Sequence, residues 1–158
     1  MKPDRRRDFD FLIGTWSVAN RRLVDRLVGS TTWEEFGGTA TCRTILDGLG
    51  NIDEIAFPTR GYTGATLRLF DPDRQEWSLY WSSTLTGRLE PPVIGHFDEG
   101  VGDFYGDDSY HETPIRVHYR WSAITPMAAR WEQSFSTDGG STWECNWVMN
   151  FSRIAISE

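Results

Sequence analysis

The residues best suited to acid–base chemistry lie in a histidine- and carboxylate-rich segment between Gly87 and His111. His96 and Asp98 stand two positions apart, so on a β-strand they share one face and form a candidate general acid–base pair. Tyr105 follows a few residues later and supplies a third candidate catalytic group. If this face points into a cavity, the three residues could act on a bound substrate. The alternative is a solvated loop, which the many turn-forming residues of the segment favour.

Aromatic residues are the second chemical feature, since the chain contains eight Trp, nine Phe and five Tyr. Trp and Tyr combine a large apolar surface with a polar group, so they line ligand cavities as well as filling cores. The plain alternative is that these residues only pack in β-strands. On the binding interpretation, ring stacking and a few polar anchors, Gln133 and His96 among them, would hold a flat or apolar small molecule. The residues expected to line the site are Trp77, Trp81, Tyr119, Trp121, Trp131, Gln133, Trp143 and Trp147.

The spacing of the remaining reactive residues gives little support to metal or nucleophile chemistry. Asp103, Asp107 and Asp108 are close in sequence, but their spacing matches no known metal-binding loop, so no metal is predicted. Cys42 and Cys145 form neither a disulfide framework nor a metal-ligand pair, and we expect both to be buried and reduced. The chain contains no phosphate loop, dinucleotide fingerprint or serine-nucleophile motif.

Alternation of apolar and polar residues predicts a chain made almost entirely of β-strands. The clearest case is 142–153, where the odd positions, Cys145 and Trp147 among them, are expected to share the buried face. In an earlier strand Leu67 and Leu69 are the apolar positions, and they alternate with Thr66 and Arg68. Turn sequences separate these runs. Strands are expected at 14–23, 32–46, 52–57, 66–69, 76–82, 93–98, 103–106, 116–123, 127–135 and 142–153.

Roughly eight to ten antiparallel strands in a chain of 158 residues indicate a sandwich or a barrel, and a barrel removes exposed sheet edges. We therefore predict an all-β fold, a single antiparallel up-and-down β-barrel that occupies residues 1–158 as one domain. Residues 1–13 place Phe9, Leu12 and Ile13 at helical spacing and are expected to form a short helical plug that closes one end. Gly14 then ends this helix.

The segment Ser136–Trp143 matches the Asp-box pattern Ser-x-Asp-x-Gly-x-Thr-Trp, which is familiar from sialidase propellers. In those proteins it is a structural hairpin away from the catalytic site, and a propeller would need the motif repeated. A single copy predicts hairpin architecture, in which the Asp138 carboxylate accepts backbone N–H groups, and no glycosidase activity.

A short helix that runs into Gly14-Thr15-Trp16 at the start of the first strand resembles the Gly-x-Trp signature of lipocalins and their calycin relatives. The resemblance implies that Trp16 closes the base of the barrel and that a basic residue of the last strand, here Arg153, packs across its ring. The wider pattern of residues 9–16, 61–64 and 70–72 resembles uncharacterised bacterial lipocalin-like proteins of a domain-of-unknown-function family. That similarity implies a fold and no activity.

Within the same superfamily, the nitrobindin-like barrels begin Gly-x-Trp-x-Gly-x-Gly and bind haem through a histidine near the C-terminus. In this chain Val18 and Asn20 stand where the two later glycines would be, and the last strand carries no histidine. Haem is therefore not expected, and no cofactor is predicted.

The formal net charge of −7 at pH 7 argues against nucleic acid as a partner, because phosphate backbones repel an acidic surface. The N-terminal residues lack the continuous apolar run of a signal peptide and no segment is apolar enough for a membrane span, so we expect a cytoplasmic protein without a membrane partner. Three functions stay open. They are binding of a small apolar molecule in the cavity, a cofactor-free isomerase, cyclase or hydrolase that uses the same cavity, and a filled barrel that acts through its surface or as a homodimer.

Overall fold

Ten β-strands and four short 3-10 turns make up residues 4–154, the part of the chain that the computed structural model describes. The strands fall where alternation predicts them, and several extend further at their ends. They are β1 (Gly14–Leu23), β2 (Trp33–Ile45), β3 (Gly50–Phe57), β4 (Tyr62–Asp71), β5 (Glu76–Ser83), β6 (Val93–Asp98), β7 (Val101–Tyr110), β8 (Thr113–Ser122), β9 (Ala128–Ser136) and β10 (Glu144–Arg153). The 3-10 turns are η1 (Arg5–Arg7), η2 (Asp10–Leu12), η3 (Leu46–Gly48) and η4 (Pro58–Arg60).

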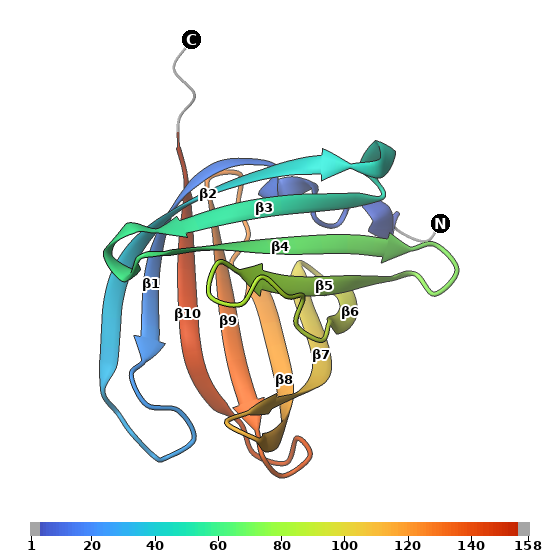
Figure 1. Ribbon diagram of the computed structural model, residues 1–158. Helices are drawn as coiled ribbons and strands as arrows, with labels where there is room; N and C mark the ends of the chain where they lie inside the picture. Colours follow the sequence, from blue (N-terminus) through green and yellow to red (C-terminus); the bar gives the residue numbers. More distant parts are fainter. Residues whose placement is uncertain (1–3, 155–158) are drawn as a thin grey trace.

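Each strand pairs antiparallel with the next one along the chain, and β1 also pairs with β10, so the sheet closes into a barrel (Figure 1). The β1–β10 pairing runs without irregularity from Trp16 opposite Arg153 to Arg22 opposite Trp147. Closure satisfies the backbone groups that an open sheet would expose at its edges. The prediction of an all-β, up-and-down antiparallel barrel is confirmed.

The up-and-down order gives the barrel two different ends. At one end the N-terminal segment leads into β1. The opposite end carries the connections between β1 and β2 (24–32), between β5 and β6 (84–92) and between β9 and β10 (137–143). In Figure 1 the N-terminal segment lies toward the right and the β1–β2 connection at the lower left. Within residues 4–154 the N-terminal segment covers the first end, so the second end is the one by which a molecule could reach the interior past the loops.

The closed end is filled by residues 4–13, which form the turns η1 and η2 rather than one continuous helix. Phe9 and Leu12 from this plug are fully buried among the apolar residues of the barrel. Phe9 packs edge-to-face against Trp77, with ring centroids 5.0 Å apart. The expected plug is therefore present, and it consists of two short 3-10 turns. Residues 1–3 of the predicted segment lie outside the described residues.

Arg153, at the end of β10, fastens the plug to the barrel. Its guanidinium carbon lies 4.1 Å from the centroid of the buried Trp16 ring. Nη1 and Nη2 donate hydrogen bonds to the carbonyl oxygens of Ile13 and Phe11 at 2.7 and 2.6 Å. Gly14 allows this approach, because a Cβ there would collide with Nη1 and its φ of +129° is rare for any other residue. The stacked cation thus joins the last strand to the segment before the first.

The buried face of β4 is the opposite of the one that alternation suggests. Thr66 and Arg68 are buried, whereas Leu67 and Leu69 are only partly buried. A charged residue is expected to face water unless its charge is compensated. Here Asp53 of β3 lies 2.6 Å from Arg68 and provides that compensation inside the barrel.

A β-bulge in β10 separates residues that strict alternation places on one face. The pairing with β9 shifts between Cys145 and Trp147, so Asn146 is an extra residue in β10. Trp147 is paired with Gln133 and lines the interior, whereas Cys145 is paired with Ser134 and is only partly buried. The expectation that Cys145 is a fully buried residue on the same face as Trp147 is therefore wrong.

We predict that Arg153→Ala lowers the free energy of unfolding by about 2 kcal/mol, because it removes charge-assisted hydrogen bonds and the stacking on Trp16 together. Urea denaturation followed by tryptophan fluorescence measures this loss. Arg116→Ala is the matched control, since the Arg116 side chain is solvent-exposed, pairs with the exposed Asp107 and lies near the exposed Tyr105 ring, so its loss should cost less than about 1 kcal/mol. Equal losses in the two variants would contradict a special role of Arg153 in closure.

Candidate ligand-binding cavity

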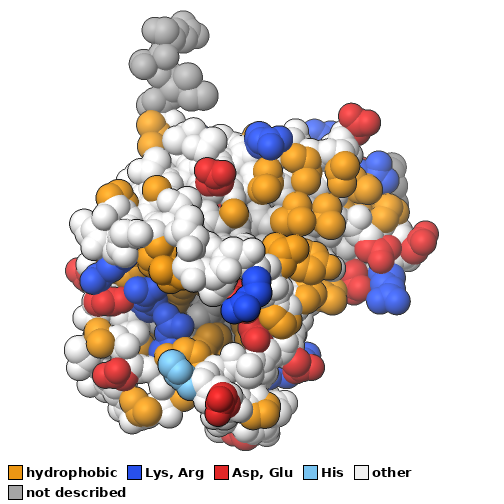
Figure 2. Space-filling model, in the orientation of Figure 1, with side chains coloured by type: hydrophobic (Ala, Val, Ile, Leu, Met, Phe, Trp, Pro, Cys, Tyr) orange, Lys and Arg blue, Asp and Glu red, His pale blue; other side chains and the backbone are white. Residues whose placement is uncertain are grey.

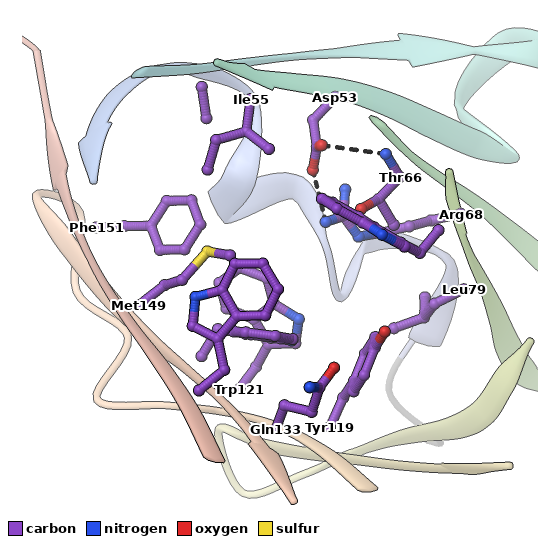
Figure 3. A pocket seen from close by; sticks show the side chains of 14 residues that line it. Asp53, Ile55, Thr66, Arg68, Leu79, Tyr119, Trp121, Gln133, Met149 and Phe151 are labelled. Carbon is purple, nitrogen blue, oxygen red and sulfur yellow. Dashed lines mark hydrogen bonds and ion pairs between the residues drawn. The ribbon is translucent and has the colours of Figure 1, made fainter. Parts of the chain in front are cut away.

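An inner chamber of about 60 Å³ lies inside the barrel (Figure 3). Its wall is mostly aromatic and aliphatic, with a few polar groups contributed by β3, β4, β8 and β9. A space of this size holds a few water molecules or part of a small ligand. The residues that line it are Ala40, Asp53, Ile55, Thr66, Arg68, Leu79, Trp81, Tyr119, Trp121, Trp131, Gln133, Trp147, Met149 and Phe151.

A larger outer chamber of about 250 Å³ adjoins the inner one toward the uncovered end of the barrel. Trp81, Tyr119, Gln133 and Trp147 belong to both walls and so form the boundary between the two chambers. The other residues of the outer wall are Arg26, Glu90, Pro91, Pro92, Val93, Gly106, Asp107, Asp108, Ser109, Tyr110, Ile115, Val117 and Phe135. The two chambers therefore lie one behind the other on a single path from the loops into the barrel.

The rings at the boundary hold one another in fixed orientations. The Trp147 ring lies edge-to-face to Trp131, with centroids 5.6 Å apart, and to Trp81, with centroids 6.2 Å apart. Tyr119 meets Trp131 in the same way at 5.0 Å. Trp147 Nε1 also donates a hydrogen bond to the Asn20 side-chain oxygen at 3.0 Å. Edge-to-face packing is a favourable arrangement of aromatic pairs, so the boundary is built before any ligand binds.

Six of the eight residues expected to bind a ligand line the inner chamber: Trp81, Tyr119, Trp121, Trp131, Gln133 and Trp147. Trp77 and Trp143 line neither chamber. Trp77 is buried against the plug, where its Nε1 donates to the carbonyl oxygen of Arg5 at 2.9 Å. Trp143 precedes β10 and is partly exposed, because it belongs to the β9–β10 hairpin.

That hairpin has the hydrogen bonds of the Asp-box pattern. The Asp138 carboxylate accepts the backbone N–H groups of Thr142 and Ser141 at 2.9 and 3.0 Å. Hydrogen bonds from Thr142 and from the Ser136 hydroxyl hold the pKa of Asp138 well below its usual range. Trp143 Nε1 donates to the Gly140 carbonyl oxygen at 3.0 Å, so the indole folds over the turn instead of entering the barrel.

The three candidates for acid–base catalysis lie outside both chambers. In β6 it is Phe97 that packs into the barrel end, so its neighbours His96 and Asp98 point away from the interior. His96 Nδ1 lies 3.2 Å from Asp98 Oδ2, and the two side chains are 40% and 71% exposed. Tyr105 is also exposed and stacks on His118 with ring centroids 4.5 Å apart. Because none of the three lines either chamber, the geometry does not support catalysis by them on a molecule bound there.

The strongest polar feature of the inner chamber, a buried ion pair between Arg68 and Asp53, was not predicted (Figure 3). Arg68 Nη2 lies 2.6 Å from Asp53 Oδ2, and Nη1 donates to the Asn51 side-chain oxygen at 2.9 Å. The backbone N–H of Thr66 donates to Asp53 Oδ1 at 3.2 Å. Sequence signals for this arrangement do exist, because Asp53 has the same alternation phase as Phe57, and Arg68 the same as Phe70. The phase was not recognised because charged residues such as Asp53 and Arg68 are expected to face water.

Arg68 connects the chamber to the plug. Its guanidinium carbon lies 5.3 Å from the centroid of Phe9 and 5.8 Å from that of Trp121. Its Nε is buried and has no hydrogen-bond partner within residues 4–154. Cys42 contacts the same network at Asn51, and burial raises the pKa of its thiol to about 11, so this group stays neutral near pH 7. One donor in the chamber wall is therefore left without an acceptor.

Two arginines near the open end are paired with one carboxylate. Arg22 Nη2 lies 2.8 Å from Glu34 Oε1, and Arg60 Nη2 lies 3.1 Å from Glu34 Oε2. Arg22 also donates to the Tyr62 hydroxyl at 2.9 Å and lies 4.8 Å from the centroid of Trp147. These contacts place positive charge beside the aromatic boundary of the chambers.

Within the described residues, no group of three or more His, Cys, Asp or Glu side chains is arranged to hold a metal ion. Nor does any helix in residues 4–154 have the length and apolar character needed to cross a membrane.

Comparison with solved structures identifies a similar barrel. The S-type phycobiliprotein lyase CPES from Guillardia theta aligns with a TM-score of 0.62 at 12% sequence identity, and the alignment covers 99% of this chain and 96% of the lyase chain. At this identity the similarity shows the fold alone, and the fold is the lipocalin-like barrel that the sequence predicted. No protein-family model matches the chain, and no curated protein matches it.

We predict that removing one partner of the Arg68–Asp53 pair is more harmful than removing both. Arg68→Met leaves a buried carboxylate without its cation and should lower the free energy of unfolding by about 3–5 kcal/mol. The double variant Arg68→Met with Asp53→Leu should recover most of this loss, because both desolvated charges are gone. Urea denaturation of the two single variants and the double variant measures the coupling. Simple additivity of the two losses would contradict the assignment of a buried, mutually compensating pair.

Proposed function

We propose that this protein binds a small apolar or aromatic molecule in the barrel cavity. The observation that carries the proposal is the pair of adjoining chambers, closed by the plug at one end and bounded by preoriented aromatic rings. Ligand sites in proteins share these features, namely a concave, mostly apolar wall with a small number of placed polar groups. The fold similarity to a phycobiliprotein lyase is compatible with such a use of the barrel and specifies no ligand. We also propose membership of the uncharacterised bacterial lipocalin-like proteins, which rests on the sequence resemblance.

The polar groups of the inner chamber favour binding over catalysis. Arg68 and Asp53 are paired with each other at 2.6 Å, so neither presents an uncompensated charge to a substrate. Tyr119 is partly buried, and burial raises the pKa of its hydroxyl above its usual range. The Gln133 amide donates to Asn146 and does not ionise. The wall thus offers hydrogen bonds and stacking surfaces rather than an acid–base pair.

The same wall argues against the alternative in which the barrel is filled entirely by its own side chains. Arg68 Nε is a buried donor without an acceptor in residues 4–154, although most buried polar atoms in proteins have a partner. A water molecule or an acceptor atom of a ligand in the adjoining space would satisfy it. We therefore expect the preferred molecule to be flat and mostly apolar, with an acceptor atom near its buried end.

We predict that the protein binds the neutral fluorophore N-phenyl-1-naphthylamine and that filling the inner chamber weakens this binding. Ala40 lines the chamber, so Ala40→Leu adds apolar volume where the ring of the fluorophore would lie. The dissociation constant should rise about tenfold, which corresponds to about 1.4 kcal/mol. Fluorescence titration measures the constant, and circular dichroism verifies that the barrel is retained.

Ala19→Leu is the matched control, because Ala19 is exposed on the outer face of β1 and the substitution is identical. This variant should bind the fluorophore like the unchanged protein. Absence of saturable binding to the unchanged protein, or equal binding by Ala40→Leu and Ala19→Leu, would overturn the proposed cavity function.

A further inference from the structure

Arg26 is a partly buried cation in the wall of the outer chamber, on the connection between β1 and β2. Its guanidinium carbon lies 5.7 Å from the ring centroid of Tyr110, 5.9 Å from that of Trp147 and 6.0 Å from that of Phe135. Figure 2 shows basic side chains gathered around a hollow at the lower left of the molecule, on the side where Figure 1 has this connection. The charge of Arg26 therefore lies in the outer chamber, 5.9 Å from the centroid of the Trp147 ring that separates the two chambers.

In contrast to its neighbours, Arg26 has no carboxylate within 4.0 Å and no hydrogen-bond acceptor among residues 4–154. Arg22 and Arg60 both use Glu34. Arginine side chains that leave bulk water are usually paired, because an uncompensated charge is costly to desolvate. Contacts with aromatic rings offset only part of this cost. Arg26 is thus a partly buried cation without an anionic partner among the described residues.

The carboxylates near the open end of the barrel, here called its mouth, do not compensate the charge of Arg26. Glu144 accepts the backbone N–H of Leu27 at 2.8 Å, and Asp107 pairs with Arg116 at 3.0 Å. Glu90 and Asp108 line the outer chamber from the β6 and β7 side, about opposite β1 in the ring of strands. Burial, followed by the charge of Arg22, lowers the pKa of Arg26.

We propose that the natural ligand of this cavity is an amphipathic anion. Its flat apolar part enters the inner chamber, and a carboxylate or an equivalent anionic group at its outer end pairs with Arg26. This inference rests on the proposed cavity function and adds the chemical class of the ligand. Trp147 connects the two parts of the site, since it lines both chambers and lies beneath both Arg22 and Arg26.

A pair of fluorophores that differ by one anionic group tests the proposal. 8-Anilino-1-naphthalenesulfonate carries a sulfonate that N-phenyl-1-naphthylamine lacks, and the ring systems are otherwise the same. We expect the unchanged protein to bind the sulfonate more tightly than the neutral compound. Arg26→Gln should weaken binding of the sulfonate about tenfold, because a charge-assisted hydrogen bond is lost, and should leave the neutral compound nearly unaffected.

Arg43→Gln is the control for net charge, since Arg43 is exposed on β2 outside both chambers and the change in charge is the same. It should alter neither constant. Circular dichroism and thermal melting of Arg26→Gln verify that the barrel is retained.

The outcomes separate this inference from the proposed function. If both fluorophores bind equally well and Arg26→Gln changes neither constant, the anionic class is wrong while the cavity function stands. If Arg43→Gln weakens the sulfonate as much as Arg26→Gln does, the effect is one of net charge and the role of Arg26 is overturned. If neither fluorophore binds the unchanged protein, the cavity function fails, and the inference that depends on it fails with it.

Discussion

Pairing of β1 with β10 is the interaction on which the other features of the molecule depend. Its register places Arg153 opposite Trp16 at one end and Trp147 opposite Arg22 at the other. The first pair becomes the stacked cation that holds the plug, and the second sets an arginine 4.8 Å from a ring that divides the two chambers. A shift of one residue in this pairing would turn the side chains of one of the two strands, and with them one of these tryptophans, to the opposite face of the sheet. Closure of the barrel and construction of its mouth are thus consequences of one strand pairing.

Strand positions were predictable because alternation and turn chemistry are local properties of the chain. The direction of individual side chains was less predictable where a long-range contact changes the cost of burial. Arg68 faces inward because Asp53, fifteen positions earlier, lies beside it in the neighbouring strand. Cys145 differs from Trp147 because Asn146 forms a bulge, and the Gln133 side chain of β9 stabilises that bulge by donating to the Asn146 oxygen at 2.9 Å. Most of the aromatic wall was predicted correctly because tryptophan favours the buried face of a strand without needing a particular partner. The polar residues of the wall are buried only where a partner compensates them, and alternation does not reveal such partners.

The two kinds of polar group in the cavity act differently on a ligand. The Arg68–Asp53 pair is compensated within the protein, so the inner chamber presents little net charge, and we expect it to favour apolar surface and one acceptor atom. The arginines at the mouth keep positive charge beside the aromatic rings, where water still reaches them. A molecule with apolar and anionic ends would satisfy both regions in one orientation only. Specificity of this kind depends on whether each charge in the wall is paired within the protein or by the ligand, and it depends less on the volume of the cavity.

An anion-binding mouth is compatible with the net charge of −7 because the two act over different distances. At physiological ionic strength the Debye length is about 8 Å, so most surface carboxylates are screened before they act on a molecule at the mouth. In the proposed complex Arg26 would contact such a molecule directly, and Arg26 is partly shielded from solvent, where screening is weaker. Added salt should therefore reduce the long-range repulsion of an anionic ligand more than it reduces the contact with Arg26. We therefore expect the acidic surface to repel polyanions such as nucleic acids, which must approach over a wide area, more strongly than a single small anion that approaches the arginine.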